Sequence, residues 1–238
     1  HGYWGNSIGI MNYSGMNKVA DENSFAVCYP QGTKDNNDTN HWNAQLGISK
    51  TNDVAYLSEL ARYLQDKHNL DSIRTYSCGH SNGGFMSYTL ACEAPDVFKA
   101  VASMAGTMSG YTWKHRDMAK PISVLQIHGL NDETVPIEGI KARGWGGAPH
   151  MDSVIEYWTD LNQCSTTDSS YFPDNTKAYY YTNGKNNTAV WYYKIDKWGH
   201  DWAASKNASN TGTIASEVIW EFFSSVGSKR LDQVEGTT

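Results

Sequence analysis

The sequence has no long hydrophobic run, and no segment approaches the length needed to cross a bilayer. It also has no run of lysine or arginine, and its formal net charge is −6 at pH 7. A chain with this charge is not expected to bind nucleic acid or an anionic membrane surface. Its first residues lack the pattern of a secretory signal peptide.

Cysteine is sparse: the chain has four, Cys28, Cys78, Cys92 and Cys164, without a C-x-x-C spacing. This pattern does not predict a zinc site or a redox motif, so no metal is expected. Cys28 and Cys78 fall in predicted buried strands, where cysteine behaves as a small apolar residue. If the protein is exported, a disulfide could form in any of three pairings, and the sequence does not choose among them.

What the sequence does contain is an alternation of predicted strands and helices, without repeats or a low-complexity linker. The predicted strands cover residues 24–29, 72–78, 99–104, 122–128, 177–181 and 190–195. The predicted helices cover residues 52–68, 84–92, 151–161 and 213–225. This order indicates an α/β fold with a mainly parallel sheet and helices on both faces. We predict a single domain over residues 1–238, with about 227–238 as a flexible tail.

One pentapeptide, Gly79–Gly83, has the pattern G-x-S-x-G and stands between a predicted strand and a predicted helix. A serine in a tight strand-to-helix turn needs small neighbours, because the backbone leaves no room for β-carbons beside it. Gly79, Gly83 and Gly84 meet this need, so Ser81 is the candidate nucleophile. Alone the pattern is weak, since glycine-rich turns precede helices for packing reasons in many α/β proteins.

Two later segments offer partners for the serine. Asp132 follows the predicted strand 122–128, and His200 follows the predicted strand 190–195. Residues just past the carboxyl ends of parallel strands converge on one edge of a sheet. The order serine, acid, histidine is the one that this chemistry uses on such a fold. The three residues therefore predict a catalytic triad.

The acid has competitors. Asp201 is adjacent to His200, but neighbouring side chains on an extended loop usually point apart. Glu133 shares the loop of Asp132 and remains the alternative there. We expect Asp132 to be the acid.

The other histidines have weaker claims to a catalytic role. His80 lies inside the pentapeptide and is expected to line the pocket or to pack, and His128 at a strand end is expected to be structural. Surface or packing roles are expected for the four that have no partner pattern: His41, His68, His115 and His150.

Five ordered motifs resemble the α/β-hydrolase superfamily, and more narrowly its polyhydroxybutyrate depolymerase and feruloyl esterase-like branch. They cover residues 1–6, 27–33, 79–84, 128–136 and 199–202. The resemblance implies a serine esterase without a metal or an organic cofactor. It also implies a secreted bacterial enzyme. The branch constrains the substrate only loosely.

The resemblance also bears on the oxyanion hole. Elbow geometry predicts the backbone N–H of Asn82 as the first donor to the oxyanion. The second donor, the backbone N–H of Tyr3, is implied only by the family, whose His-Gly segment matches His1-Gly2.

The sequence departs from the family at two places. The family usually has Trp-Pro after the histidine and several glycines before it, whereas Trp202 is followed by Ala203, and Lys197-Trp198 precede Gly199. The His-Gly segment, which normally follows a buried strand, opens this chain, so we expect an N-terminally shortened fold. A lost strand would leave a sheet edge that folded proteins normally cover. We therefore predict a homo-oligomer, a dimer that covers this edge.

These observations predict a serine carboxylesterase that hydrolyses short-chain acyl esters through an acyl-enzyme. Alternatives with the same chemistry are a feruloyl or aryl esterase and a polyhydroxyalkanoate depolymerase. A serine peptidase on this fold has no supporting feature in the sequence. An alternative of another class is a non-catalytic carbohydrate-binding protein, because many of the nine tryptophans fall in predicted loops.

Several aromatic residues border the catalytic motifs. We expect four residues to bind substrate, as a wall for an acyl group or a platform for sugar rings: Trp4, His80, Trp198 and Trp202. The alternative for such residues is ordinary loop packing.

Overall fold

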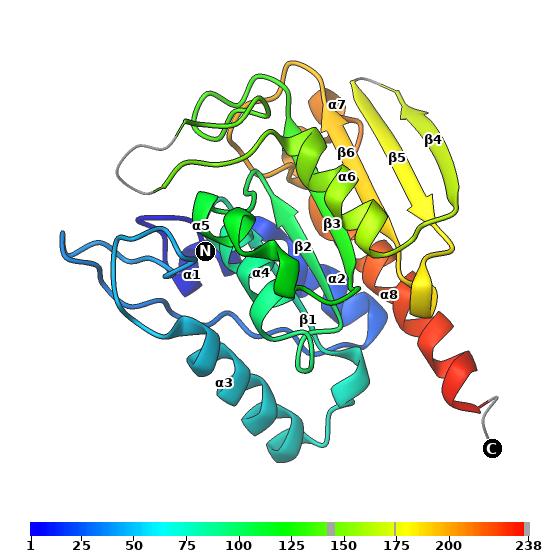
Figure 1. The fold of residues 1–238 in the computed structure, drawn as a ribbon, viewed down its shortest axis with the longest axis horizontal. Helices are drawn as coiled ribbons and strands as arrows, with labels where there is room; N and C mark the ends of the chain where they lie inside the picture. The colour runs from blue at the N-terminus through cyan, green and yellow to red at the C-terminus, as the bar shows by residue number, and fades with distance from the viewer. Residues whose placement is uncertain (142–145, 174, 236–238) are drawn as a thin grey trace.

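The computed structural model describes residues 1–141, 146–173 and 175–235, with side chains to residue 227 (Figure 1). In these residues one mixed sheet has the strand order β1-β2-β3-β6-β5-β4. The first four of these strands run parallel, and β5 and β4 are antiparallel to their neighbours. The strands are β1 (Tyr76–His80), β2 (Ala100–Met104), β3 (Ser123–Gly129), β4 (Thr166–Phe172), β5 (Thr176–Thr182) and β6 (Val190–Ile195).

Helices cover both faces of the sheet (Figure 1). They are α1 (Ser7–Ser14), α2 (Met16–Asn23), α3 (Asp53–His68), α4 (Asn82–Glu93), α5 (Gly110–Lys114), α6 (Met151–Leu161), α7 (Ala208–Thr211) and α8 (Ala215–Glu235). Within the described residues, no helix combines the length and the apolar character that crossing a membrane requires.

The alternation of side chains along β2 explains the two layers of helices. Ala102 and its neighbours at every second position belong to one core cluster, together with Phe222 of α8. Val101 points to the opposite face and belongs to a second cluster, together with Trp158 of α6. A strand that is buried on both faces must have helices on both faces. The expected α/β fold is thus confirmed.

The segment 24–29 is not a strand, contrary to the expectation. Its alternating residues Phe25, Val27 and Tyr29 pack against the core, which explains the strand-like pattern. The segment nevertheless belongs to no ladder of the sheet, since β1 pairs with β2 alone among the described strands. Cys28 and Cys78 are therefore exposed, which corrects the expectation that both are buried.

Several further elements differ from the prediction. The structure adds α1 and α2, which are short, and β4, whose polar sequence is almost wholly exposed. The last helix does not end at residue 225 but continues to Glu235, so residues 227–235 of the expected tail are helical. At Gly227 a β-carbon would lie 2.4 Å from the Tyr76 hydroxyl, so glycine lets the helix pass close to that side chain. Residues 236–238 of the expected tail lie outside the described residues.

Candidate active site

Ser81 occupies the sharp turn between β1 and α4, with φ 52° and ψ −117°. Few residues other than glycine adopt a positive φ, so the turn is strained. A β-carbon on Gly79 would lie 2.3 Å from the carbonyl carbon of Gly83, a separation that no packed structure tolerates. The turn therefore requires the small neighbours that the sequence provides.

The structure brings the three predicted triad residues together at the carboxyl edge of the sheet. The Nε2 atom of His200 lies 2.8 Å from the Oγ atom of Ser81, and its Nδ1 atom lies 2.7 Å from Oδ2 of Asp132. Asp132 follows β3 and His200 follows β6, and these strands are neighbours in the sheet. A carboxylate only accepts, so Nδ1 donates to Asp132 and Nε2 is left to accept the Ser81 proton.

The carboxylate of Asp132 is buried, with only 4% of the residue exposed. Its Oδ1 atom accepts hydrogen bonds from the backbone N–H groups of Thr134 at 2.9 Å and Val135 at 2.8 Å. Burial alone would raise the pKa of Asp132, but hydrogen bonds from His128, His200 and Val135 outweigh it and hold this pKa well below its usual value. The acid is therefore ionised at neutral pH.

The two competing acids do not take this position. The side chain of Asp201 accepts a hydrogen bond from the backbone N–H of Trp202 at 2.8 Å. Glu133 is exposed. The carboxylate that contacts His200 is that of Asp132.

Asn82 is the first residue of α4, so its backbone N–H has no acceptor within the helix. Its side chain pairs with both backbone polar groups of Trp42: Oδ1 accepts from the N–H at 2.6 Å, and Nδ2 donates to the carbonyl at 3.0 Å. The backbone N–H of Ser81 is occupied, since it donates to the carbonyl of Met104 at 2.8 Å. The backbone N–H of Asn82 is therefore free of an acceptor within α4, whereas the backbone N–H of Ser81 already has one.

The first residues of the chain lie beside the nucleophile. A β-carbon on Gly2 would lie 3.4 Å from the β-carbon of Ser81. The hydroxyl of Tyr3 donates to the carboxylate of Asp35 at 2.5 Å. Asn40 holds the next residues, because its carbonyl accepts from the Trp4 N–H at 3.0 Å and its side chain donates to the Gly5 carbonyl at 3.0 Å.

His80 lies against the histidine of the triad, with ring centroids 5.2 Å apart. Burial, and then the neighbouring His200, lower the pKa of His80 to about 3, so its ring is neutral. Its Nδ1 atom lies 3.3 Å from the hydroxyl of Tyr13, which is 40% exposed. Tyr13 and His80 thus form a polar and aromatic wall beside the triad.

The three tryptophans that were expected to bind substrate differ in their surroundings. Trp202 is 2% exposed and belongs to the core, where its Nε1 donates to the Ser14 carbonyl at 3.1 Å. It therefore packs behind the wall rather than on an open surface. Trp4 is 77% exposed, and Trp198 donates from Nε1 to the carbonyl of Asp201 at 3.0 Å.

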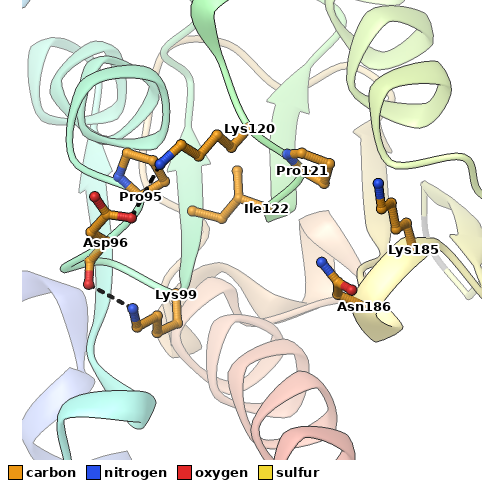
Figure 2. Close-up of a pocket in the computed structure, with 8 residues that line it drawn as sticks. All are labelled: Pro95, Asp96, Lys99, Lys120, Pro121, Ile122, Lys185 and Asn186. Atoms are coloured by element: carbon orange, nitrogen blue, oxygen red, sulfur yellow. Dashed lines mark hydrogen bonds and ion pairs between the residues drawn. The ribbon is translucent and has the colours of Figure 1, made fainter.

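A pocket of about 340 Å³ lies at the opposite end of the sheet, where β2, β3 and β6 begin (Figure 2). Lys99 donates to the carbonyl of Asp96 at 2.6 Å, and Lys120 lies 3.4 Å from the carboxylate of Asp96. Because none of the predicted site residues lines this pocket, it is separate from the triad. Among the described residues, no group of three His, Cys, Asp or Glu side chains is arranged to hold a metal ion.

Sequence reasoning missed Tyr13, Asp35 and Asn40, which hold or line the site. No sequence pattern marks them, because each acts through a contact with a distant part of the chain. It also gave no role to Gln126, although a polar residue inside the apolar run of β3 is a detectable signal.

Comparison with known proteins gives the family and the fold. A family model described as "Prolyl oligopeptidase family" matches residues 12–226. "Probable feruloyl esterase C" of Aspergillus clavatus is 28% identical over 87% of this chain and 72% of its own length. "Feruloyl esterase C" of Emericella nidulans is 27% identical over 77% of this chain, which spans 62% of that protein, less than two thirds.

Among solved structures, an acetyl xylan esterase from Aspergillus awamori matches with a TM-score of 0.58 and 14% identity. The match covers 89% of this chain and 86% of that one, which supports the fold alone. The relatives bear out the expected α/β-hydrolase esterase. The family match spans most of the sequence, and the chain belongs to the prolyl oligopeptidase family.

Proposed function

We propose that this chain is a serine carboxylic ester hydrolase that acts on short-chain acyl esters through an acyl-enzyme on Ser81. The observation that supports this most is the continuous hydrogen-bonded set of Ser81, His200 and Asp132, with distances of 2.8 Å and 2.7 Å. A nucleophile, a base and an orienting acid in this geometry are what acyl transfer requires.

The proposed reaction has two steps. Ser81 Oγ attacks the ester carbonyl while His200 Nε2 takes the hydroxyl proton, and the C–O bond to the alcohol breaks as His200 returns that proton to the alcohol oxygen. Water then attacks the acyl-enzyme, with His200 again as base, and releases the carboxylic acid and the free serine. Asp132 stabilises the imidazolium that forms in both steps.

The proposed oxyanion donors are the backbone N–H groups of Asn82 and Tyr3. Asn82 is fixed through its side chain by Trp42, and Tyr3 is fixed through its hydroxyl by Asp35. Donors that are held before the charge develops need no reorganisation during the reaction. Removal of one such donor typically slows turnover by about 10²–10³-fold.

A feruloyl or aryl ester is the second candidate substrate. The names of the curated relatives favour it, since both are described as feruloyl esterases. The exposed rings of Tyr13 and Trp4 could contact an aromatic acyl group. The description of the family, prolyl oligopeptidase, suggests a peptide as another candidate substrate, because a serine nucleophile also cleaves peptide bonds.

The test compares the chain with its Ser81→Ala variant on p-nitrophenyl acetate and butyrate, methyl ferulate, polyhydroxybutyrate and a dipeptide p-nitroanilide. We expect hydrolysis of the short p-nitrophenyl esters that the variant lacks. Faster turnover of methyl ferulate, the polyester or the anilide would move the substrate class to that compound. Activity that persists in Ser81→Ala would overturn the proposed nucleophile, and polysaccharide binding without any hydrolysis would favour a binding protein.

A further inference from the structure

A row of buried polar side chains lies directly behind the acid of the triad. Tyr88 of α4, Gln126 of β3 and His128 of β3 are each 0% exposed. Polar groups in a protein interior cost stability unless they are hydrogen-bonded, so each needs a partner. These three side chains contact one another, the backbone carbonyls of Gly106 and Ile127, and the loop that holds Asp132.

The amide of Gln126 can adopt one orientation only. Its Nε2 atom lies 3.0 Å from the carbonyl of Gly106, which can accept but not donate, so the nitrogen must face that carbonyl. Its Oε1 atom then accepts from the hydroxyl of Tyr88 at 2.9 Å. Nε2 also lies 2.9 Å from Nδ1 of His128 and 3.3 Å from the carbonyl of Ile127, and an amide nitrogen can only donate to either atom.

This orientation fixes the tautomer of His128. Because Gln126 donates to Nδ1, that nitrogen is an acceptor and has no hydrogen. The hydrogen is therefore on Nε2, which lies 2.7 Å from the carbonyl of Val135 and 3.3 Å from Oδ2 of Asp132. The N–H of His128 thus donates to the Val135 carbonyl, and it lies beside the carboxylate of Asp132, which attracts it.

Oδ2 of Asp132 is the same oxygen that accepts from His200. We propose that His128 is a positioning residue for the proposed esterase: its Nε2–H, set by Gln126 and Tyr88, anchors Oδ2 of Asp132 in line with His200. The inference rests on the proposed function, because it assigns Asp132 the role of orienting acid.

The anchor adds to the groups that hold the carboxylate of Asp132. The backbone N–H groups of Thr134 and Val135 donate to Oδ1, and His200 donates to Oδ2. The N–H of His128, 3.3 Å from Oδ2, attracts the same oxygen. Without His128, Oδ2 keeps a single side-chain donor, so the position of this oxygen is held less firmly. Catalytic groups need positions held within about 0.5 Å, so such loosening lowers the rate without weakening substrate binding.

The experiment compares His128→Met, which keeps a similar volume and removes the donor, with His128→Gln, whose amide N–H can replace Nε2–H. We expect His128→Met to lower kcat on p-nitrophenyl acetate by about tenfold with KM unchanged, the factor for one lost hydrogen bond to a charged group. His128→Gln should recover most of that loss. If both variants lose activity equally, or if neither does, the positioning role is wrong.

A second measurement does not depend on turnover. The proton between His200 Nδ1 and Asp132 gives a separate downfield NMR signal in the resting protein, and it should shift in His128→Met and return in His128→Gln. An unchanged signal overturns the inference, whether or not the wild-type chain hydrolyses any ester. Absence of wild-type hydrolysis together with the shifted signal would instead refute the proposed function alone.

If His128→Met does not fold, the double variant Gln126→Met/Tyr88→Phe tests the same chain of contacts. It removes the groups that set the His128 tautomer and nearly preserves their volumes. We expect a smaller loss of kcat with KM unchanged and a broadened His200–Asp132 signal. A folded double variant with wild-type kcat and signal would show that Gln126 and Tyr88 do not set His128.

Discussion

The two halves of the candidate site are held by different means. Asp132 and His200 follow β3 and β6, which are interior strands with neighbours on both sides. Ser81 and Asn82 follow β1, which has one neighbour among the described strands, and Tyr3 belongs to the irregular first residues. The first group, the acid half, is fixed by buried hydrogen bonds within the loop and strand that carry Asp132. The second group, the nucleophile half, depends on contacts from residues 35–42. The difference indicates that the nucleophile half is the more easily loosened.

The largest expected effect on kcat comes from a substitution that disrupts the acid half. Asp132→Asn should lower kcat by about 10⁴-fold, because the amide favours the wrong tautomer of His200. Steady-state hydrolysis of p-nitrophenyl acetate measures it. Asp201→Asn is the matched control and should leave kcat near the wild-type value. An equal loss in the two variants would mean that the acid has been assigned incorrectly.

A smaller effect is expected in the nucleophile half. Tyr3→Phe removes the hydrogen bond to Asp35 and should lower kcat by about tenfold through a less fixed oxyanion donor. Tyr29→Phe, which removes the bond to Asn17, is the control and should have no effect on kcat. If Tyr3→Phe matches wild type in kcat, Tyr3 is not held through its hydroxyl.

Low pH should lower the stability of the folded protein, and Asp132 of the acid half should contribute most of this loss. The hydrogen bond from Tyr3 lowers the pKa of Asp35, and the hydrogen bonds to Asp132, which outweigh its burial, lower the pKa of Asp132. A carboxyl whose pKa is lower in the folded state contributes stability above its unfolded pKa of about 3.9 and loses it as pH falls. The Tm should therefore drop between about pH 5 and pH 3.

The Asp132→Asn variant provides the comparison for this acid effect. Its Tm should depend less steeply on pH than that of wild type, because the substituted group does not titrate. Parallel Tm curves for the two proteins would assign the acid sensitivity to other groups.

The smallest effect on kcat is expected at β1, the end strand of the described sheet, where we propose that two copies of the chain associate. Cys78→Lys places a charge on this edge and should convert a dimer to a monomer, measured by light scattering. Ser169→Lys on exposed β4 is the control. A wild-type chain that is monomeric at all concentrations would contradict the proposed association.

Sequence reasoning predicted the interior strands and the triad positions because both follow from local patterns. A buried run such as that of β3 and a G-x-S-x-G turn carry their own signal. The segment 24–29 has the pattern of a strand, yet pairing needs a partner strand, which no local pattern supplies. The contacts of Asp35, Asn40 and His128 likewise depend on which distant residues meet.

The unusual backbone of Ser81 also bears on how such a chain could lose its chemistry over evolutionary time. Glycine adopts a positive φ without the cost that serine incurs, so Ser81→Gly would relieve strain of about 1 kcal/mol or more while it removes the nucleophile. An inactive but more robust protein is therefore a single codon change away. A serine at this position is therefore unfavourable for the backbone, and the proposed nucleophile role accounts for it.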